Sequence, residues 1–128
     1  MDGVATFTTI IGSVIGVASL ANAAWQYRRK LNLEIFRIYA DKYNAIVTPE
    51  IYDKWQAALN GEQQHWVALN STMIQYLNLV WEESYLSRER VIQKRLWQLW
   101  LPGIRRVLAS EFAKTVQKAN GFHFPYEL

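Results

Sequence analysis

The sequence contains no cysteine and only two histidines among its 128 residues. The absence of cysteine excludes disulfides, thiolate zinc sites and a cysteine nucleophile. His65 and His123 stand far apart and match no metal-ligand spacing such as HExxH, so we expect neither a catalytic metal nor another cofactor. Phosphate-binding glycine loops and the GxSxG nucleophile motif are also missing. These absences argue against an enzyme.

Charge is missing from a long segment near the N-terminus. No charged residue occurs from Gly3 through Tyr27. A helix of this length, rising about 1.5 Å per residue, could cross a hydrocarbon core of roughly 30 Å. We therefore predict a transmembrane anchor over residues 1–30. The segment is only moderately apolar, so a buried amphipathic helix remains the alternative.

The residues that flank this segment predict its orientation. Asp2 precedes it and a basic triplet at 28–30 follows it, which is the reverse of the charge order in a cleaved signal peptide. By the positive-inside rule, we expect the inner (cytoplasmic) membrane, with the N-terminus outside and the C-terminal domain in the cytoplasm. The residues expected at the membrane interface are Trp25, Tyr27, Arg28, Arg29 and Lys30.

Small and polar residues recur every three or four positions along one side of the predicted anchor. Lipid gives helices no hydrophobic reason to associate, so close backbone approach and interhelical hydrogen bonds must hold them together. The pattern, which includes a GxxxG match, predicts a homo-oligomer, although small residues are common in membrane helices generally. This seam, with the adjacent Asn22, consists of Ala5, Thr9, Gly12, Gly16, Ser19, Asn22, Ala23 and Gln26.

For residues 31–128 the spacing of apolar residues predicts an all-α cytoplasmic bundle of four to five helices. No strand-like alternation occurs in the sequence. The aromatic tail at 122–126 should pack back on the bundle, because exposed rings favour aggregation. The expected helices cover Leu31–Val47, a segment from a Thr48-Pro49-Glu50 cap to about Gly61, Glu62 to about Leu86, a segment from a Ser87–Arg90 cap to a turn or kink at Pro102-Gly103, and a segment capped by Ser110 that ends near Asn120-Gly121.

Two adjacent acids, Glu82 and Glu83, fall late in the longest expected helix, and one of them must lie closer to its apolar face. A carboxyl buried beside Trp81 could be tuned as a general acid. The preferred interpretation is an ion pair that fixes helix register. A second carboxylate or a pocket nearby would distinguish the two. The expected partners in the ion pair are Arg95, Arg105 and Arg106.

Positive charge is densest between residues 88 and 106, where Glu89 is the only acid. The arginine guanidinium groups could bind the phosphate of an anionic ligand, and Trp97 and Trp100, interleaved with them, could stack on its bases. The preferred interpretation is that these cations are solvated on different helix faces and that the tryptophans are buried. The candidate residues are Arg88, Arg90, Lys94, Arg95, Arg105 and Arg106.

Two tryptophan-containing runs, Tyr76–Leu86 and Trp97–Arg105, resemble a group of bacterial proteins that have one N-terminal span and a tryptophan-rich cytoplasmic helical domain. The resemblance implies this architecture, and the group has no agreed activity. The layout is also similar to that of small membrane effectors of bacterial antiviral systems, in which single-span subunits oligomerise and permeabilise the inner membrane. The degenerate nuclease-like Arg and His motif that some of those effectors retain does not occur here.

The leading hypothesis is a homo-oligomeric single-pass membrane protein that acts as a pore-forming or membrane-perturbing effector of the bacterial defence type. The alternative is a membrane-tethered binding module that recruits a protein partner or an anionic ligand to the inner membrane face. The expected partners are a second copy of the chain and the lipid bilayer, and no nucleic acid is expected.

Overall fold

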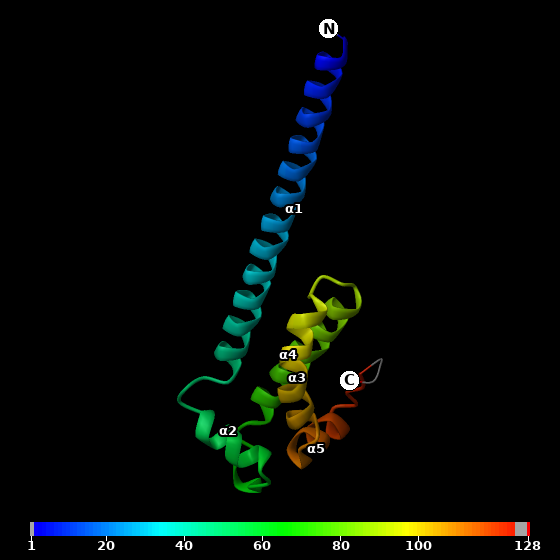
Figure 1. Ribbon diagram of the computed structural model, residues 1–128. Coiled ribbons are helices and arrows are strands. Elements are labelled where there is room, and N and C mark those ends of the chain that lie inside the picture. The colour runs from blue at the N-terminus through cyan, green and yellow to red at the C-terminus, as the bar shows by residue number, and fades with distance from the viewer. Residues whose placement is uncertain (1, 125–127) are drawn as a thin grey trace. The chain divides into compact units, whose positions relative to one another are not determined.

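The structure is a computed structural model that describes the backbone of residues 2–124 and 128 and the side chains of residues 16–124 and 128. The chain divides into two compact units, Met1–Ile35 and Phe36–Leu128. The described residues form helices and no strand, as the sequence predicts. The elements are α1 (Asp2–Ile46), α2 (Tyr52–Leu59), a short 3₁₀ helix η1 (Gln63–His65), α3 (Asn70–Arg88), α4 (Lys94–Leu108) and α5 (Glu111–Ala119) (Figure 1).

Helix α1 continues without interruption from the uncharged segment to Ile46. No proline occurs before residue 49, so nothing in the sequence stops the helix earlier. In the first unit, all described side chains from residue 16 to residue 30 are exposed. They include Val17 and Leu20, which are 67% and 73% exposed.

Among the residues that the structure describes, no helix combines the length and the apolar character needed to cross a membrane. Of the predicted span from Gly3 to Tyr27, the side chains up to residue 15 lie outside the described part. The span has no support from this finding and stays a prediction.

The core of the second unit is built around aromatic side chains. Trp55 of α2 contacts Tyr76 of α3 and Phe112 of α5, with ring centroids 5.5 and 6.2 Å apart. Trp66 stacks on Phe112, with ring centroids 5.5 Å apart. Helix α5 contacts α2, α3 and α4, which closes the bundle (Figure 1). The most deeply buried residues are Trp55, Ala58, Met73, Leu77, Val80, Ile92, Phe112 and Ala113.

Two helices begin later than predicted. Residues 48–51 form a turn, closed by a bond from the Ile51 N–H to the Thr48 carbonyl, and α2 begins only at Tyr52 without a side-chain cap. The segment expected to be helical from Glu62 contains η1 and further turns, and α3 begins at Asn70. The first error arises because the Thr48-Pro49-Glu50 pattern forms a turn instead of a cap. The second arises because apolar spacing continues through turns whose residues, such as Trp66 and Leu69, contribute to the core.

No turn forms at Pro102-Gly103, because α4 continues through both residues to Leu108. The alternative prediction, a kink within the helix, stays a prediction. Ile104 and Val107, beyond the proline, are buried in the core. Their burial outweighs the missing hydrogen bond at residue 102. The predicted cap at Ser87–Arg90 is also displaced: Arg90 has a positive φ of 60° in the loop, and Gln93 holds the N-cap position of α4.

The predictions for the C-terminal end are confirmed where the structure describes it. Ser110 caps α5 by accepting a 3.2 Å bond from the Ala113 N–H. The helix ends at Ala119, and Gly121 has the positive φ of 61° that favours glycine. Phe122 and Phe124 contact each other, with ring centroids 5.2 Å apart, and both pack against the core. Residues 125–127 of the predicted tail lie outside the described residues.

Candidate functional site

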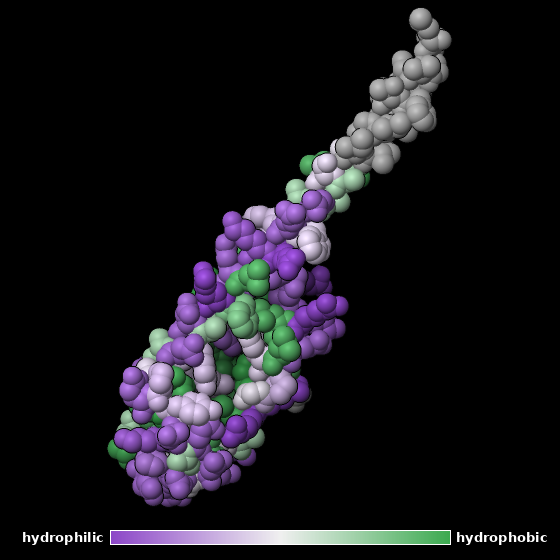
Figure 2. Space-filling model, turned by 60° about the vertical axis from the view of Figure 1, so that its left-hand side comes forward, coloured by the Kyte–Doolittle hydropathy of each residue, from purple (hydrophilic) through white to green (hydrophobic). Residues whose placement is uncertain are grey.

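A pocket of about 440 Å³ opens into the second unit. It is lined by the second-unit part of α1 and by α2, α3 and α4. On the face shown in Figure 2, apolar and weakly polar side chains gather in a hollow bordered by hydrophilic ones. The lining is rich in aromatic side chains, namely Phe36, Tyr39, Tyr43, Tyr52, Trp55, Tyr76 and Trp100.

These rings support one another across the helices. Trp100 of α4 contacts Phe36 and Tyr39 of α1, with ring centroids 6.3 and 6.0 Å apart. Tyr43 meets Tyr76 edge to face at 6.2 Å. Tyr39 and Tyr76 are buried, whereas Phe36 is about half exposed. The pocket therefore has a closed inner part and an open outer part.

Glu83 is the one carboxyl among the described residues that line the pocket. It is only 7% exposed, and no described residue makes a hydrogen bond or an ion pair with it. Burial, and then the neighbouring charge of Glu82, raise the pKa of Glu83 to about 7, although Lys42 acts in the opposite direction. The group can therefore gain or lose a proton near neutral pH.

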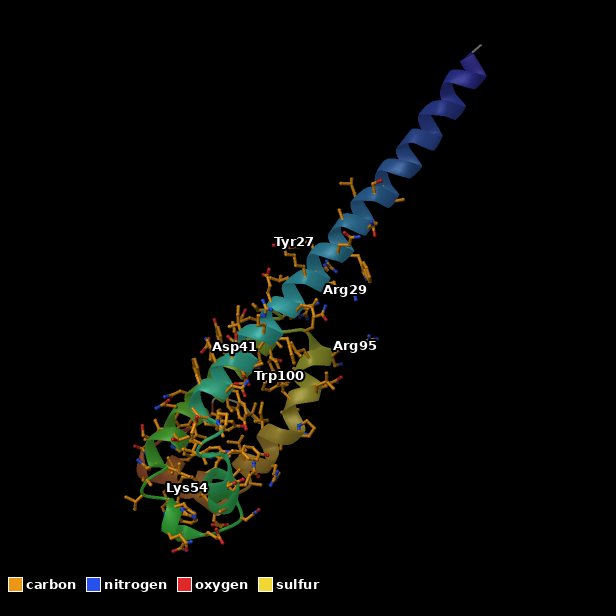
Figure 3. The ribbon with its side chains drawn as sticks, turned by 90° about the vertical axis from the view of Figure 1, so that its left-hand side faces the viewer. Tyr27, Arg29, Asp41, Lys54, Arg95 and Trp100 are labelled. Atoms are coloured by element: carbon orange, nitrogen blue, oxygen red, sulfur yellow. The ribbon has the colours of Figure 1, made fainter. Side chains whose placement is uncertain are left out.

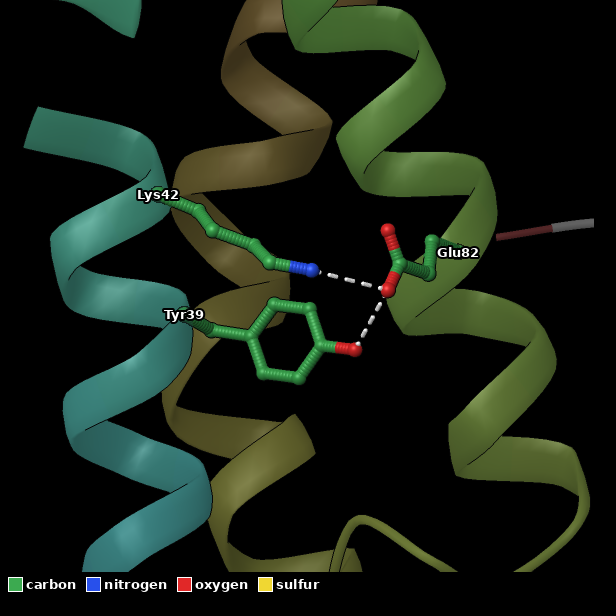
Figure 4. Close-up of polar contacts among 3 residues, drawn as sticks. All are labelled: Tyr39, Lys42 and Glu82. Carbon is green, nitrogen blue, oxygen red and sulfur yellow. Dashed lines mark hydrogen bonds and ion pairs between the residues drawn. The ribbon is translucent and has the colours of Figure 1, made fainter. Parts of the chain in front are cut away.

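Glu82, the next residue along the chain, has a different environment (Figure 4). Its Oε1 accepts hydrogen bonds from the Tyr39 hydroxyl at 2.9 Å and the Lys42 Nζ at 3.0 Å. Burial by itself raises the pKa of Glu82, but the bonds from Lys42 and Tyr39 and the Lys42 charge outweigh burial and lower this pKa below its ordinary value. Glu82 is thus an ionised, paired group outside the pocket lining.

The remaining polar side chains of the pocket include four phenols, the Gln56 amide and the Arg106 guanidinium. Arg106 donates a 2.9 Å bond to the Gln56 Oε1 between α4 and α2. Burial raises the pKa of the Tyr76 hydroxyl well above its usual range, and the charges of Glu83 and Tyr43 raise it further. Burial likewise raises the pKa of Tyr43, with a smaller opposing effect from Arg106. Both phenols stay protonated at neutral pH and can donate hydrogen bonds.

One of the two acids does lie on the buried side of α3, as predicted, and it is Glu83. The prediction of an arginine partner is wrong, because the ion pair forms between Glu82 and Lys42 of α1. Sequence reasoning missed Lys42 and the contribution of Phe36 and Tyr43 to the pocket. The spacing of residues 36, 39 and 43 places three rings on one side of a helix, which was a readable signal.

The basic residues fall into two groups. Arg105 and Arg106 lie in the last turn of α4, while the others surround its start. Arg95 and Arg105 are ten residues apart in the helix, a distance of about 15 Å along its axis. Arg95 points outward from α4 (Figure 3). The group at the start of α4 consists of Arg88, Arg90, Lys94 and Arg95.

The predicted seam is described only in part. The side chains of Ala5, Thr9 and Gly12 lie outside the described residues. The Arg29 guanidinium lies over the Trp25 ring at 5.5 Å, within cation–π range. The other described residues of the seam and of the predicted interface are exposed, namely Gly16, Ser19, Asn22, Ala23, Gln26, Tyr27, Arg28 and Lys30.

Fold and site together define an all-helical protein with a long N-terminal helix and an aromatic pocket of ligand size. No protein-family model, curated protein or solved structure matches the chain.

Proposed function

We propose that the protein is a membrane-anchored binding module whose helical unit holds a small organic ligand in the aromatic pocket. The observation that carries this proposal is the unpaired, buried Glu83 in the pocket wall. A pocket of about 440 Å³ is within the size range of small-molecule sites, which are mostly apolar with a few polar groups.

The energetics of Glu83 support a ligand rather than a purely structural role. A buried carboxyl without a hydrogen-bonding partner destabilises a fold, and an apolar residue at the same place would avoid this cost. Binding sites commonly carry such locally unfavourable groups, because a ligand supplies the missing partner.

Binding fits the pocket better than catalysis does. General acid–base chemistry commonly uses a second positioned group. Glu83 is the single carboxyl among the described lining residues, and the Glu82 carboxylate is held by Tyr39 and Lys42. The pocket offers one titratable acid and several phenols, which suits recognition of a ligand.

A variant that fills the pocket tests this proposal. Gly103 lines the pocket, and a Cβ built there meets no atom within 4 Å. Gly103→Leu should narrow the pocket without a backbone clash, and Gly103→Ala is the matched control. Saturation-transfer NMR with a fragment library should find fragments that bind the full chain and the Gly103→Ala variant but not Gly103→Leu. A library without any such fragment overturns the proposal.

The anchor in this proposal is the uncharged segment from Gly3 to Tyr27, with the helical unit in the cytoplasm. Its support is the lack of charge, the basic triplet that follows, and the exposure of Val17 and Leu20. Because the chain has no cysteine, single cysteines report topology cleanly. A membrane-impermeant maleimide should label Asp2→Cys in spheroplasts and Lys118→Cys only after lysis. Release of the chain from membranes by alkaline carbonate would contradict the anchor.

A second candidate is self-association into a pore-forming or membrane-perturbing complex. The seam that contains Gly12 and Gly16 favours it, because small residues permit close helix packing in lipid. Crosslinking in native membranes should give oligomers that the double variant Gly12→Leu and Gly16→Leu reduces strongly. The variant Val14→Leu and Val17→Leu, off the seam, is the control. Monomer alone in the wild type eliminates this candidate.

A further inference from the structure

The charge distribution inside the pocket indicates what kind of ligand it takes. Two charged residues are among the described lining residues, Glu83 and Arg106. Arg106 is exposed and already donates to Gln56, whereas Glu83 is buried without a partner. The deep part of the pocket therefore offers a negative charge, and the positive charge is at its exposed edge.

The aromatic rings add to this preference. The face of an aromatic ring carries negative potential, and it attracts a cation within about 6 Å of its centre. Tyr39 of α1 and Tyr76 of α3 line the same pocket as Glu83, and all three residues are buried. Trp100 contacts the Tyr39 ring at 6.0 Å and extends the aromatic wall.

We propose that the pocket binds a small organic cation, with its ammonium group against the Glu83 carboxylate and the rings of Tyr39 and Tyr76. This inference rests on the proposed function, since it names the ligand class of the same pocket. A neutral ligand leaves Glu83 without a counter-charge, and an anion is repelled by it. A metal ion requires several oxygen ligands, and Glu83 is the one carboxylate among the described lining residues.

Three probes of nearly equal shape test the charge preference. Choline carries a positive charge, 3,3-dimethyl-1-butanol is its neutral isostere, and 3,3-dimethylbutanoate is an anion of similar size. The full chain is studied in a maltoside detergent, which has no cationic headgroup. Binding is followed by the indole N–H signals of the six tryptophans, two of which line the pocket. Choline should bind about 10-fold more tightly than the neutral isostere, and the anion should not bind.

Two isosteric variants locate the charge that matters. Glu83→Gln should abolish the preference for choline over the neutral isostere. Glu82→Gln is the matched control, because Glu82 has the same charge and lies one residue away, but outside the lining. An equal loss of choline binding in both variants would contradict the assignment to Glu83.

Choline affinity should also rise with pH between 5.5 and 8.5, because the cation binds the ionised form of Glu83. This pH dependence should disappear in Glu83→Gln. The other titratable and charged groups of the surrounding helices are Tyr39, Lys42 and Tyr43 of α1, Tyr52 of α2, Tyr76 and Glu82 of α3, and Arg106 of α4.

The outcomes separate this inference from the proposed function. If choline and the neutral isostere bind equally and Gly103→Leu blocks both, the pocket is a binding site and the cation inference is wrong. If Gly103→Leu changes the binding of no probe or fragment, the proposed function itself fails. Dodecylphosphocholine below its micelle-forming concentration identifies the source of the charge. Tighter binding than choline indicates a lipid headgroup, and equal binding indicates a free cation.

Discussion

Glu82 and Glu83 are consecutive residues of α3, yet their carboxyls have opposite pKa shifts. Glu82 lies at the outer side of the helix and accepts hydrogen bonds from Tyr39 and Lys42. Glu83 lies about 100° further around the helix, buried in the pocket wall. One turn of α3 therefore holds an acid that stabilises the fold when ionised next to an acid that stabilises it when protonated.

The first prediction concerns stability against pH. The pKa of Glu83 is about 7 in the folded chain, whereas its ordinary value, expected in the unfolded chain, is 4.5. The folded state therefore binds this proton more tightly than the unfolded state. The stabilisation of the folded state by proton binding at Glu83 is complete below pH 4.5 and is lost as the pH rises through 7. Glu83→Gln should remove this loss, so its free energy of unfolding should exceed that of the wild type above pH 8 by up to about 3 kcal/mol.

Urea unfolding of both proteins at pH 5.5 and pH 8.5 measures this difference. Glu82→Gln serves as the control and should keep a reduced pH dependence in this range, because burial, the larger cause of the raised pKa of Glu83, remains while the charge of Glu82 is removed. The contribution of Glu82 itself to stability is lost only in acid, because its pKa is lowered. The same pH dependence in the wild type and in Glu83→Gln would show that Glu83 is not buried in the way described.

The second prediction compares the two bonds to Glu82. Tyr39 is 6% exposed, so its hydroxyl bond to a carboxylate should contribute about 1.5 kcal/mol. The side chains of Lys42 and Glu82 are both almost half exposed, so their ion pair should contribute less than about 1 kcal/mol. Double-mutant cycles that pair Glu82→Gln with Tyr39→Phe and with Lys42→Met measure the two coupling energies. A larger coupling to Lys42 reverses the expected order.

The third prediction concerns Gly103, which is an exposed residue inside α4. A Cβ at this position meets no neighbouring atom, and alanine loses less backbone entropy than glycine on entering a helix. Gly103→Ala should raise the free energy of unfolding by about 1 kcal/mol, measured by urea unfolding. Gly61→Ala is the contrasting variant and should destabilise the fold, because Gly61 has a positive φ of 101°. Destabilisation by Gly103→Ala would contradict the helical conformation at this residue.

The fourth prediction concerns the cap of α5. The Ser110 hydroxyl accepts a bond from the Ala113 N–H and donates a 2.6 Å bond to the Val107 carbonyl, and the residue is buried. Ser110→Ala should lower the free energy of unfolding by about 1–2 kcal/mol, because both groups lose their partner away from water. Ser110→Thr keeps the hydroxyl and should lose less. Equal thermal shifts for the two variants would show that the cap contributes nothing.

Local sequence signals predicted the parts of the fold that local chemistry determines. The Ser110 cap and the glycine that follows α5 were readable because a cap is a contact between near neighbours. The turn expected at Pro102 does not form, because the burial of Ile104 and Val107, which depends on the whole bundle, overrides the local preference of proline.

The candidate site was predictable only in part, for the same reason. The pattern predicted that one of Glu82 and Glu83 lies closer to the apolar face of its helix, and the structure identifies it as Glu83. It could not show that Lys42, 40 residues earlier in the chain, is the partner of Glu82. The pocket combines side chains from residue 36 to residue 107, and such long-range proximity follows from packing rather than from spacing along one helix.

The continuity of α4 through Pro102 has a consequence for access to the pocket. Pro102 has no N–H to donate to the Gln98 carbonyl, and Gly103 beside it is the residue with the greatest backbone freedom. The turn that carries both also carries Trp100 and lines the pocket. Because α4 stays helical through Pro102, Trp100 and Gly103 hold fixed places in the pocket wall, next to the open outer part through which the pocket contents can exchange with solvent without unfolding of the bundle.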